Sequence, residues 1–199
     1  MLLLIAAILV NTLFRSVSIL PPVILITIVI LFINMQEDVV HTDALTGMNN
    51  RRKANEYIGG LIENLSEEKP LILYMCDINR FKQINDRYGH AEGDKALLLV
   101  AKTLKTVIDR YEGFAARFGG DEFLLSHSTK DTSSDTPQEL IKSINQMLSD
   151  ACKKADCPYT LSLCIGHTLC TDPSRPLQDY IYEADQDLYV CKRKFHAKK

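Results

Sequence analysis

The residues best suited to chemistry in this chain are 118–123, which read Phe-Gly-Gly-Asp-Glu-Phe. Apolar and aromatic residues at 114–118 and 123–125 predict two short strands around them. Gly119 and Gly120 are expected to form the connecting turn with positive φ, which places Asp121 and Glu122 at the mouth of a β-hairpin. Adjacent carboxylates repel each other, and such a pair is typical of a site that binds a cation or transfers a proton. The alternative is an ordinary solvated turn, because Asp and Gly are common turn residues.

A third acid stands at the end of an apolar run. Residues 71–76 predict a buried central strand, which ends abruptly at Asp77. If the hairpin neighbours this strand, Asp77 and Asp121 face each other across about 5 Å, a separation suited to sharing Mg²⁺. Mg²⁺ is commonly held by one or two carboxylates and completed by substrate phosphates, so a nucleoside triphosphate is the natural ligand.

The segment that follows Asp77 supplies groups for such a ligand. Lys82 and the backbone N–H groups of residues 81–86 are candidates to bind phosphate. Asn85 and Asp94 are candidates to read the edge of a purine base.

The elements that must position these residues follow from periodicity and turn signals. The chain predicts the order helix, strand, helix, hairpin, helix, strand, helix, which indicates an α+β or α/β sandwich around one sheet. A loop is expected at 126–137. The remaining elements are helices at 52–65, 94–108, 138–154 and 177–194 and a strand at 160–169.

Composition narrows the class of protein. The chain has 199 residues, with 24% charged and 46% hydrophobic residues, as in an ordinary globular protein. Its net charge of −2 argues against a nucleic-acid partner. The 6 cysteines include no Cys-x-x-Cys pair, so neither a zinc site nor a disulfide framework is expected, and a reducing compartment fits the folded domain.

The first 33 residues differ sharply from the rest, because they carry one charge, Arg15. Val17–Ile33 is expected to be a transmembrane helix, either alone or as a hairpin with Met1–Phe14. A cleaved signal peptide and a buried core helix are the alternatives, and the chain lacks the basic start and small-residue cleavage site of a signal peptide. The predicted organisation is a membrane segment at 1–34, a linker at 35–42 and a globular domain at 43–199.

Four ordered motifs resemble one family. Residues 43–52 read Asp-Ala-Leu-Thr-Gly-Met-Asn-Asn-Arg-Arg, residues 77–86 read Asp-Ile-Asn-Arg-Phe-Lys-Gln-Ile-Asn-Asp, and Gly89-His90 with Gly93-Asp94 precede the 119–123 signature. Together they resemble the GGDEF-type diguanylate cyclases over about residues 40–196. The resemblance implies a domain like a polymerase palm, with a central, mostly antiparallel five-stranded sheet.

The resemblance also implies an activity, which is the condensation of two GTP into cyclic di-GMP with release of pyrophosphate. The divalent metal, Mg²⁺ or alternatively Mn²⁺, would be held by Asp77, the main-chain carbonyl of Ile78, and Asp121. Glu122 would be catalytic, assisting deprotonation of the attacking ribose hydroxyl. By the same resemblance, guanine would be read by Asn85 and Asp94, and phosphate would be bound by Phe81, Lys82 and Lys192.

Each half-site would hold one GTP, so the resemblance implies a homodimer and an inactive monomer. Membrane anchoring then predicts an inner-membrane location with the catalytic domain in the cytoplasm, where GTP is found. The main alternative is a non-catalytic GTP-binding or interaction module of the same fold. Retention of all four signature residues argues against it, and Asp94 argues against an enzyme that makes a different cyclic nucleotide.

The chain departs from the family pattern at three places. Asn79 replaces a second Asp, with at most a modest expected effect, and His196 replaces an Arg that usually binds phosphate, where Arg193 or Lys194 would have to compensate. The product-inhibition motif Arg-x-x-Asp corresponds to Arg110-Tyr111-Glu112-Gly113. Because its Asp is missing, no high-affinity inhibition by cyclic di-GMP is expected.

Overall fold

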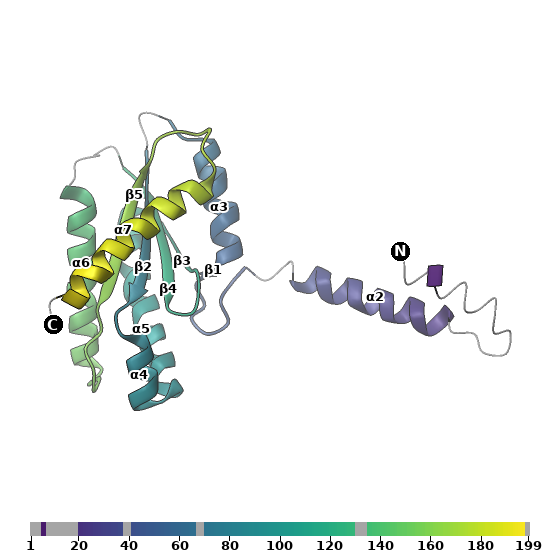
Figure 1. Ribbon diagram of the computed structural model, residues 1–199, viewed down its shortest axis with the longest axis horizontal. Coiled ribbons are helices and arrows are strands. Elements are labelled where there is room, and N and C mark those ends of the chain that lie inside the picture. Colours follow the sequence, from purple (N-terminus) through teal and green to yellow (C-terminus); the bar gives the residue numbers. More distant parts are fainter. Residues whose placement is uncertain (1–4, 7–19, 38–40, 67–69, 130–134, 198–199) are drawn as a thin grey trace. The chain divides into compact units, whose positions relative to one another are not determined.

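The computed structural model describes residues 5–6, 20–37, 41–66, 70–129 and 135–197 (Figure 1). The chain divides into two compact units, Met1–Val40 and His41–Lys199. The second unit contains a five-stranded sheet in the order β1-β3-β4-β2-β5. Its strands are β1 (Asn49–Asn50), β2 (Leu71–Ile78), β3 (Phe114–Arg117), β4 (Glu122–Ser128) and β5 (Leu163–Cys170).

The sheet is mixed. β1 runs parallel to β3, whereas β3 with β4, β4 with β2, and β2 with β5 are antiparallel. Helices cover both of its faces, so the predicted α+β class is confirmed. They are α3 (Arg51–Glu63), α4 (Phe81–Tyr88), α5 (His90–Ile108), α6 (Asp135–Lys154) and α7 (Leu177–Ala197), with a short 3₁₀ helix at Asp109–Tyr111.

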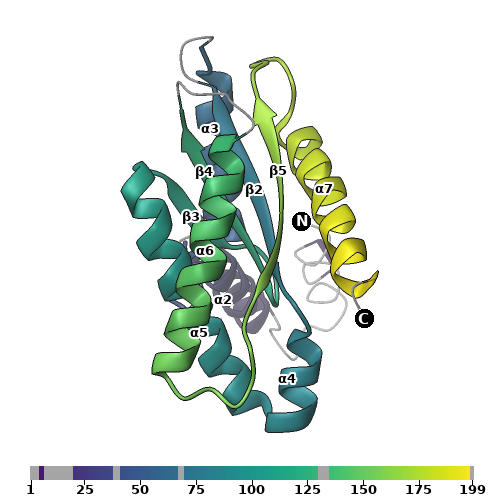
Figure 2. The ribbon, with the colours of Figure 1, turned by 90° about the vertical axis from the view of Figure 1, so that its left-hand side faces the viewer.

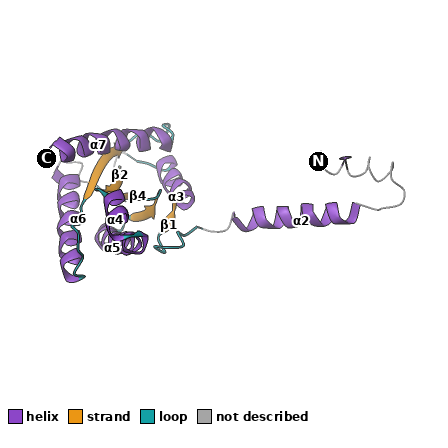
Figure 3. Cartoon of the chain, turned by 60° about the horizontal axis from the view of Figure 1, so that its bottom comes forward, coloured by secondary structure: helices purple, strands orange, loops and turns teal. Residues whose placement is uncertain are grey.

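Two apolar clusters lie on opposite faces of the sheet. One packs side chains of α5 and α6 against Ile72, Tyr74 and Cys76 of β2, and the other packs α3 and α7 against Leu71 and Leu73. Figure 2 shows α5 and α6 on one side of the sheet and α7 on the other, and Figure 3 shows the helices around the strands. The alternation along β2 is the period of a strand that is buried on both faces.

Most predicted elements are present with shifted ends. The apolar run at 71–76 is indeed a central strand, and all eight residues of β2 are buried. Helix α3 begins after Asn50, whose side chain accepts the N–H of Lys53 and caps the helix. The expected loop at 126–137 is wrong at both ends, because β4 continues to Ser128 and α6 begins at Asp135, while residues 130–134 lie outside the described residues.

Helix α4 is absent from the elements that the sequence predicts. The sequence predicts phosphate and guanine contacts for this segment but no helix, yet Phe81, Ile84 and Tyr88 recur at the spacing of one helical face and pack on the core. Gly89, at φ 86°, separates α4 from α5, which therefore begins four residues before the expected start at Asp94.

The expected transmembrane segment is not supported, and with it the inner-membrane location is wrong. Among the described residues no helix is both long enough and apolar enough to cross a membrane. Helix α2 covers Leu20–Glu37, and its sequence turns polar from Asn34 onward. The apolar part from Leu20 to Ile33 rises only about 21 Å, against a hydrocarbon thickness of about 30 Å. The companion arm expected at Met1–Phe14 falls outside the described residues apart from 5–6.

Candidate active site

The predicted acids meet where β2 ends and β4 begins. Asp77 lies opposite Glu122 in the antiparallel register, and the N–H of Ile78 donates to the carbonyl oxygen of Asp121 at 3.3 Å. The expectation that Asp121 faces Asp77 across the strands is therefore off by one residue. The turn sets this offset, because the first residue of β4 after the turn is Glu122.

The turn itself differs from the expected one. Among the described glycines only Gly47 and Gly89 have positive φ, so Gly119 and Gly120 do not supply it. The N–H groups of Phe118 and Gly119 both donate to the carbonyl of Glu122, at 2.8 and 3.2 Å. Gly119 instead borders the Glu122 side chain, because a Cβ there would lie 2.7 Å from Glu122 Oε2 and the carboxylate would have to turn aside. The signature glycine thus leaves room for the Glu122 carboxylate.

Arg117 holds the turn from the side. Its Nη2 donates to the carbonyl of Gly120 at 2.7 Å, and its Nη1 donates to both carboxylate oxygens of Asp43 at 3.0 and 3.1 Å. Burial opposes the charge of Asp43, but hydrogen bonds from Thr46 and Arg117 outweigh burial and lower its pKa. These contacts tie the first motif, at 43–52, to the residue that precedes Asp121. Sequence reasoning assigned Asp43 to the start of the domain and did not single out Arg117.

Lys192 of α7 contacts Asp77 from the face of the sheet that α7 covers. Its Nζ lies 2.7 Å from Asp77 Oδ2, and the two side chains are 35% and 12% exposed. Burial raises the pKa of Asp77, with Lys192 opposing the shift and Asp121 adding to it. Burial tends to lower the pKa of Lys192, but its hydrogen bond and ion pair with Asp77 dominate and raise it. The predicted binding residue Lys192 thus contacts the predicted metal ligand Asp77.

Excess negative charge also affects Glu122. Burial raises the pKa of Glu122 first, and the charges of Asp77, Asp121 and Asp185 raise it further, while Lys192 lowers it. A carboxyl group with a raised pKa is suited to accept a proton near neutral pH. Asp185 of α7 was missed by sequence reasoning, since nothing in the sequence reports that its helix lies over the acids.

The donor set at this site fits a hard cation. Among the described residues, no three His, Cys, Asp or Glu side chains form a ready-made metal cluster. Two carboxylates with a backbone carbonyl are nevertheless a set that Mg²⁺ accepts when phosphates and water complete its shell. Buried Asp77, beside two further acids and holding a lysine ammonium at 2.7 Å, is a position that takes positive charge.

The predicted nucleotide-binding residues lie on α4 and at the start of α5. Phe81 and Lys82 form the first turn of α4; Phe81 packs partly on the core and Lys82 is exposed. Asn85 lies one turn later, against Gly93, where a Cβ would overlap its Oδ1. The absence of a side chain at Gly93 therefore leaves space for the Asn85 amide. Asp94 follows on α5 and is exposed.

The C-terminal end of α7 carries the residue that departs from the family pattern. His196 is exposed and stands edge-on to Phe195 with ring centroids 5.7 Å apart. Phe195 in turn lies under the guanidinium of Arg80, at 5.2 Å. Aromatic packing thus fixes this end of α7 beside α4, while the imidazole of His196 faces solvent.

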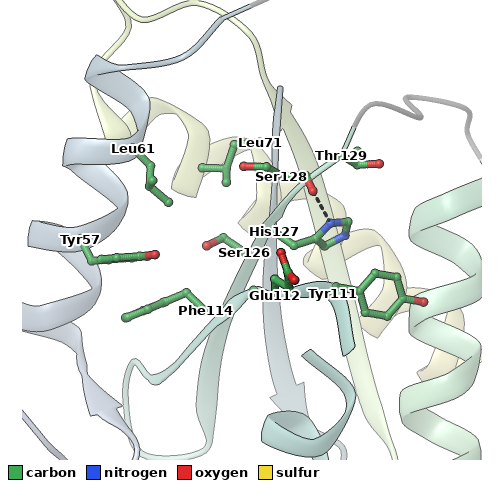
Figure 4. A pocket seen from close by; sticks show the side chains of 11 residues that line it. Tyr57, Leu61, Leu71, Tyr111, Glu112, Phe114, Ser126, His127, Ser128 and Thr129 are labelled. Carbon is green, nitrogen blue, oxygen red and sulfur yellow. Dashed lines mark hydrogen bonds between the residues drawn. The ribbon is translucent and has the colours of Figure 1, made fainter. Parts of the chain in front are cut away.

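The segment that corresponds to the product-inhibition motif lines a cavity at the other end of β4 (Figure 4). The cavity measures about 310 Å³ and has no Lys or Arg among its lining residues, which include Glu112, Phe114 and Ser126. Gly113 fits closely there, because a Cβ would lie 2.6 Å from the carbonyl oxygen of Ser126 and 2.7 Å from Ile108 Cγ1. The backbone leaves no room for an Asp at this position.

Comparison with known proteins agrees with the geometry. The family model for "Diguanylate cyclase, GGDEF domain" matches residues 40–198. Signaling protein YkoW of Bacillus subtilis is 33% identical over 162 residues, which cover 79% of this chain and 20% of YkoW. Diguanylate cyclase DgcM of Escherichia coli is 30% identical, covering 78% of this chain and 37% of DgcM. A diguanylate cyclase of Vibrio cholerae is 31% identical, and the match covers 77% of this chain and 47% of that protein. The chain thus spans less than half the length of these relatives.

Solved structures share the fold. A sensory box/GGDEF family protein from Caulobacter crescentus is 27% identical with a TM-score of 0.68, covering 78% of this chain and 99% of that one. The coiled coil and GGDEF domain of DgcB from the same species, solved with c-di-GMP, has a TM-score of 0.68 at 21% identity. The match covers 85% of this chain and 89% of that one. With the family model matching most of its length, the chain belongs to the GGDEF-domain diguanylate cyclase family.

Proposed function

We propose that this protein is an active diguanylate cyclase, which joins two GTP molecules into cyclic di-GMP and releases pyrophosphate. The observation that carries the proposal is the meeting of Asp77, Glu122 and Lys192 at one end of the sheet, with Asp121 adjacent. Members of the family use a divalent metal ion, and we propose Mg²⁺, with Mn²⁺ as a substitute. Asp77, Asp121 and the carbonyl of Ile78 would hold it.

The reaction is a nucleophilic substitution at phosphorus. The ribose 3′-hydroxyl of one GTP attacks the α-phosphorus of the other, the new P–O bond forms as the bond to pyrophosphate breaks, and the hydroxyl proton passes to a base. Glu122 is suited to this task because burial and its acidic neighbours raise its pKa. The metal, when bound, neutralises charge that develops on the phosphate oxygens. Lys82, Lys192 and the N–H groups at the start of α4 would add donors to the phosphates.

Recognition of guanine is assigned to Asn85 and Asp94. A carboxylate accepts hydrogen bonds from the N1–H and 2-amino groups of guanine, whereas adenine would present an acceptor there. The contact of Gly93 with Asn85 supports the assignment, because the absence of a side chain at Gly93 leaves space for the amide at the junction of α4 and α5. Each protomer would present one GTP, so the bond-forming step requires a homodimer with two sites face to face.

A non-catalytic GTP-binding module remains the alternative function. Such a module has no need for a carboxylate with a raised pKa, or for the acids of the signature beside Asp77. Gly119, Asp121 and Glu122 are all retained here. This combination favours catalysis.

The test is incubation of the full chain with GTP and Mg²⁺, followed by identification of the product by mass. We expect cyclic di-GMP from the native protein and from Glu139→Gln, a control on an exposed position of α6. Glu122→Gln is expected to abolish the product while the folded protein still binds GTP. Absence of cyclic di-GMP from a demonstrably dimeric native sample would refute the proposal.

We further propose that the product does not inhibit this enzyme with high affinity. The position of the motif's Asp is Gly113, which has no space for a side chain, and the adjoining cavity lacks a basic lining residue to meet two phosphates. Turnover is therefore expected to be unchanged by added cyclic di-GMP at micromolar concentrations. Inhibition in that range would contradict the assignment.

A further inference from the structure

The ion pair between Lys192 and Asp77 is not explained by phosphate binding alone. A lysine that only binds substrate phosphates could remain in solvent until they arrive, yet Lys192 Nζ lies 2.7 Å from Asp77 Oδ2 in the proposed metal site. The side chain of Asp77 is only 12% exposed, so the ammonium group meets the carboxylate largely out of water. Within the described part of the chain, this cation occupies the most buried of the three acids.

We propose that Lys192 is a placeholder for the metal ion: without nucleotide its ammonium group occupies the cation position at Asp77, and a divalent ion must displace it. The inference rests on the proposed function only in assigning the metal to Asp77. The ammonium group stands in for the metal's charge. It neutralises Asp77 while Glu122 and Asp121 stay close by.

Competition follows from distance and charge. A metal ion would bind the same carboxylate oxygen at about 2.1 Å, closer than the ammonium nitrogen lies now. Two cations on one small carboxylate repel each other strongly at partly buried positions. Lys192 and the metal therefore cannot both occupy Asp77 Oδ2, and every metal-binding event includes the cost of breaking the ion pair.

The side chain can leave while the helix stays. Gly166 of β5 lets α7 approach closely, since a Cβ there would overlap the backbone nitrogen of Leu188 and would lie 2.7 Å from its Cα. This contact is one turn before Lys192 and anchors the helix on the sheet. The lysine side chain, in contrast, is 35% exposed and has four rotatable carbons. Its ammonium can swing from Asp77 to a phosphate without a backbone movement.

The arrangement couples the two ligands of the site. Phosphates draw Lys192 away from Asp77 and so open the metal position, and a metal at Asp77 frees Lys192 for phosphate. By linkage, each ligand raises the affinity for the other by the same factor. The free enzyme would therefore bind metal weakly until nucleotide arrives.

The experiment measures Mn²⁺ binding to the full chain without nucleotide, by the electron paramagnetic resonance of free Mn²⁺. Lys192→Met is expected to bind Mn²⁺ about tenfold more tightly than the native protein, because the competitor is removed. Lys142→Met, which loses one charge at an exposed position of α6, is the matched control and should bind like the native protein. Equal or weaker binding by Lys192→Met would overturn the proposal, since damage to the site cannot produce a gain.

Two further measurements keep the result unambiguous. Asp77→Asn combined with Lys192→Met should lose the gain, and a gain that persists would place the metal elsewhere and overturn the proposal. In thermal unfolding, Mn²⁺ should raise the midpoint of Lys192→Met more than that of the native protein, because a ligand that binds more tightly stabilises the folded state more at the same concentration. An equal rise would also overturn it. None of these readouts uses product formation, so they stand apart from the test of cyclase activity.

Discussion

Glu122 is an acid whose surroundings resist its ionisation. Burial and the neighbouring carboxylates raise its pKa, so over a range above the usual value the native state keeps a proton that the unfolded chain has released. Stability therefore falls as the pH rises through that range. The carboxylate that is proposed to act as the base thus destabilises the fold when it is ionised.

The first prediction follows from this decrease of stability with rising pH. Glu122→Gln should raise the free energy of unfolding at pH 8 by less than about 1 kcal/mol, because water screens a partly exposed carboxylate. The gain should shrink at pH 4, where the native carboxyl is protonated. Urea unfolding at both pH values measures the difference, with Glu139→Gln as the control. A gain that is larger at pH 4 than at pH 8 would contradict the assignment.

A second prediction concerns Gly93, whose missing side chain leaves space for the Asn85 amide. Gly93→Ala should displace that amide and raise the KM for GTP about five- to tenfold, the equivalent of about 1 kcal/mol of lost binding, with a small effect on kcat. Steady-state kinetics measure both constants. Gly60→Ala is the matched control, because a Cβ at this exposed position of α3 has nothing within 4 Å. An unchanged KM would show that Asn85 does not contact the base.

Individual residues also show where sequence reasoning ends. Asp77 was predictable because an apolar run of strand length ends in a charge, and the signature acids were predictable from their type and spacing. The residue opposite Asp77 was not predictable, because the register of β4 on β2 depends on the geometry of the turn. A shift of one residue in that register exchanges Asp121 for Glu122. The bond between Asp43 and Arg117 joins residues 74 apart in sequence, and no local pattern reports it.

At the scale of elements, α7 is the part that the site depends on most. It carries Lys192 and Asp185 and packs against both β5 and β2. Its length and apolar face were predictable from periodicity, but its distance from the sheet was not, because Gly166 looks like any other glycine within a strand. Helix α4, in contrast, was predictable, because Phe81, Ile84 and Tyr88 already have the spacing of one helical face.

A third prediction tests the packing of α7. Gly166→Ala places a Cβ against the backbone of Ala184 and Leu188, which cannot move without shifting the helix. The variant should lose about 1–3 kcal/mol of stability, as overpacked cores do, and should lose activity because Lys192 moves with its helix. Chemical denaturation and the product assay measure the two effects. Gly60→Ala, by contrast, should be slightly more stable than the native protein, because it replaces an unhindered helical glycine. A fully active and equally stable Gly166→Ala would refute the close approach.

At the scale of the whole molecule, the globular unit presents one set of the proposed catalytic groups. Asp77, Glu122 and Lys192 form a single site, while the proposed product requires two phosphodiester bonds between two nucleotides. Under the proposed function, one protomer would position one GTP and activate one hydroxyl. Catalysis by a pair of identical sites then makes the rate depend on association as well as on chemistry.

The last prediction uses that requirement. Specific activity should fall on dilution as dimers dissociate, and mixing with Glu122→Gln should poison the native protein, since a mixed dimer can form only one of the two bonds. At equal concentrations and random pairing, roughly half of the native protomers sit in mixed dimers, so cyclic di-GMP per native chain should fall to roughly half. A linear dinucleotide with one bond should accumulate in its place.

Adding the same amount of a folded variant that cannot bind GTP, Asp94→Ala combined with Asn85→Ala, should lower cyclic di-GMP without that linear product. Activity proportional to native protein at all dilutions and mixtures would instead indicate that one protomer performs the whole reaction.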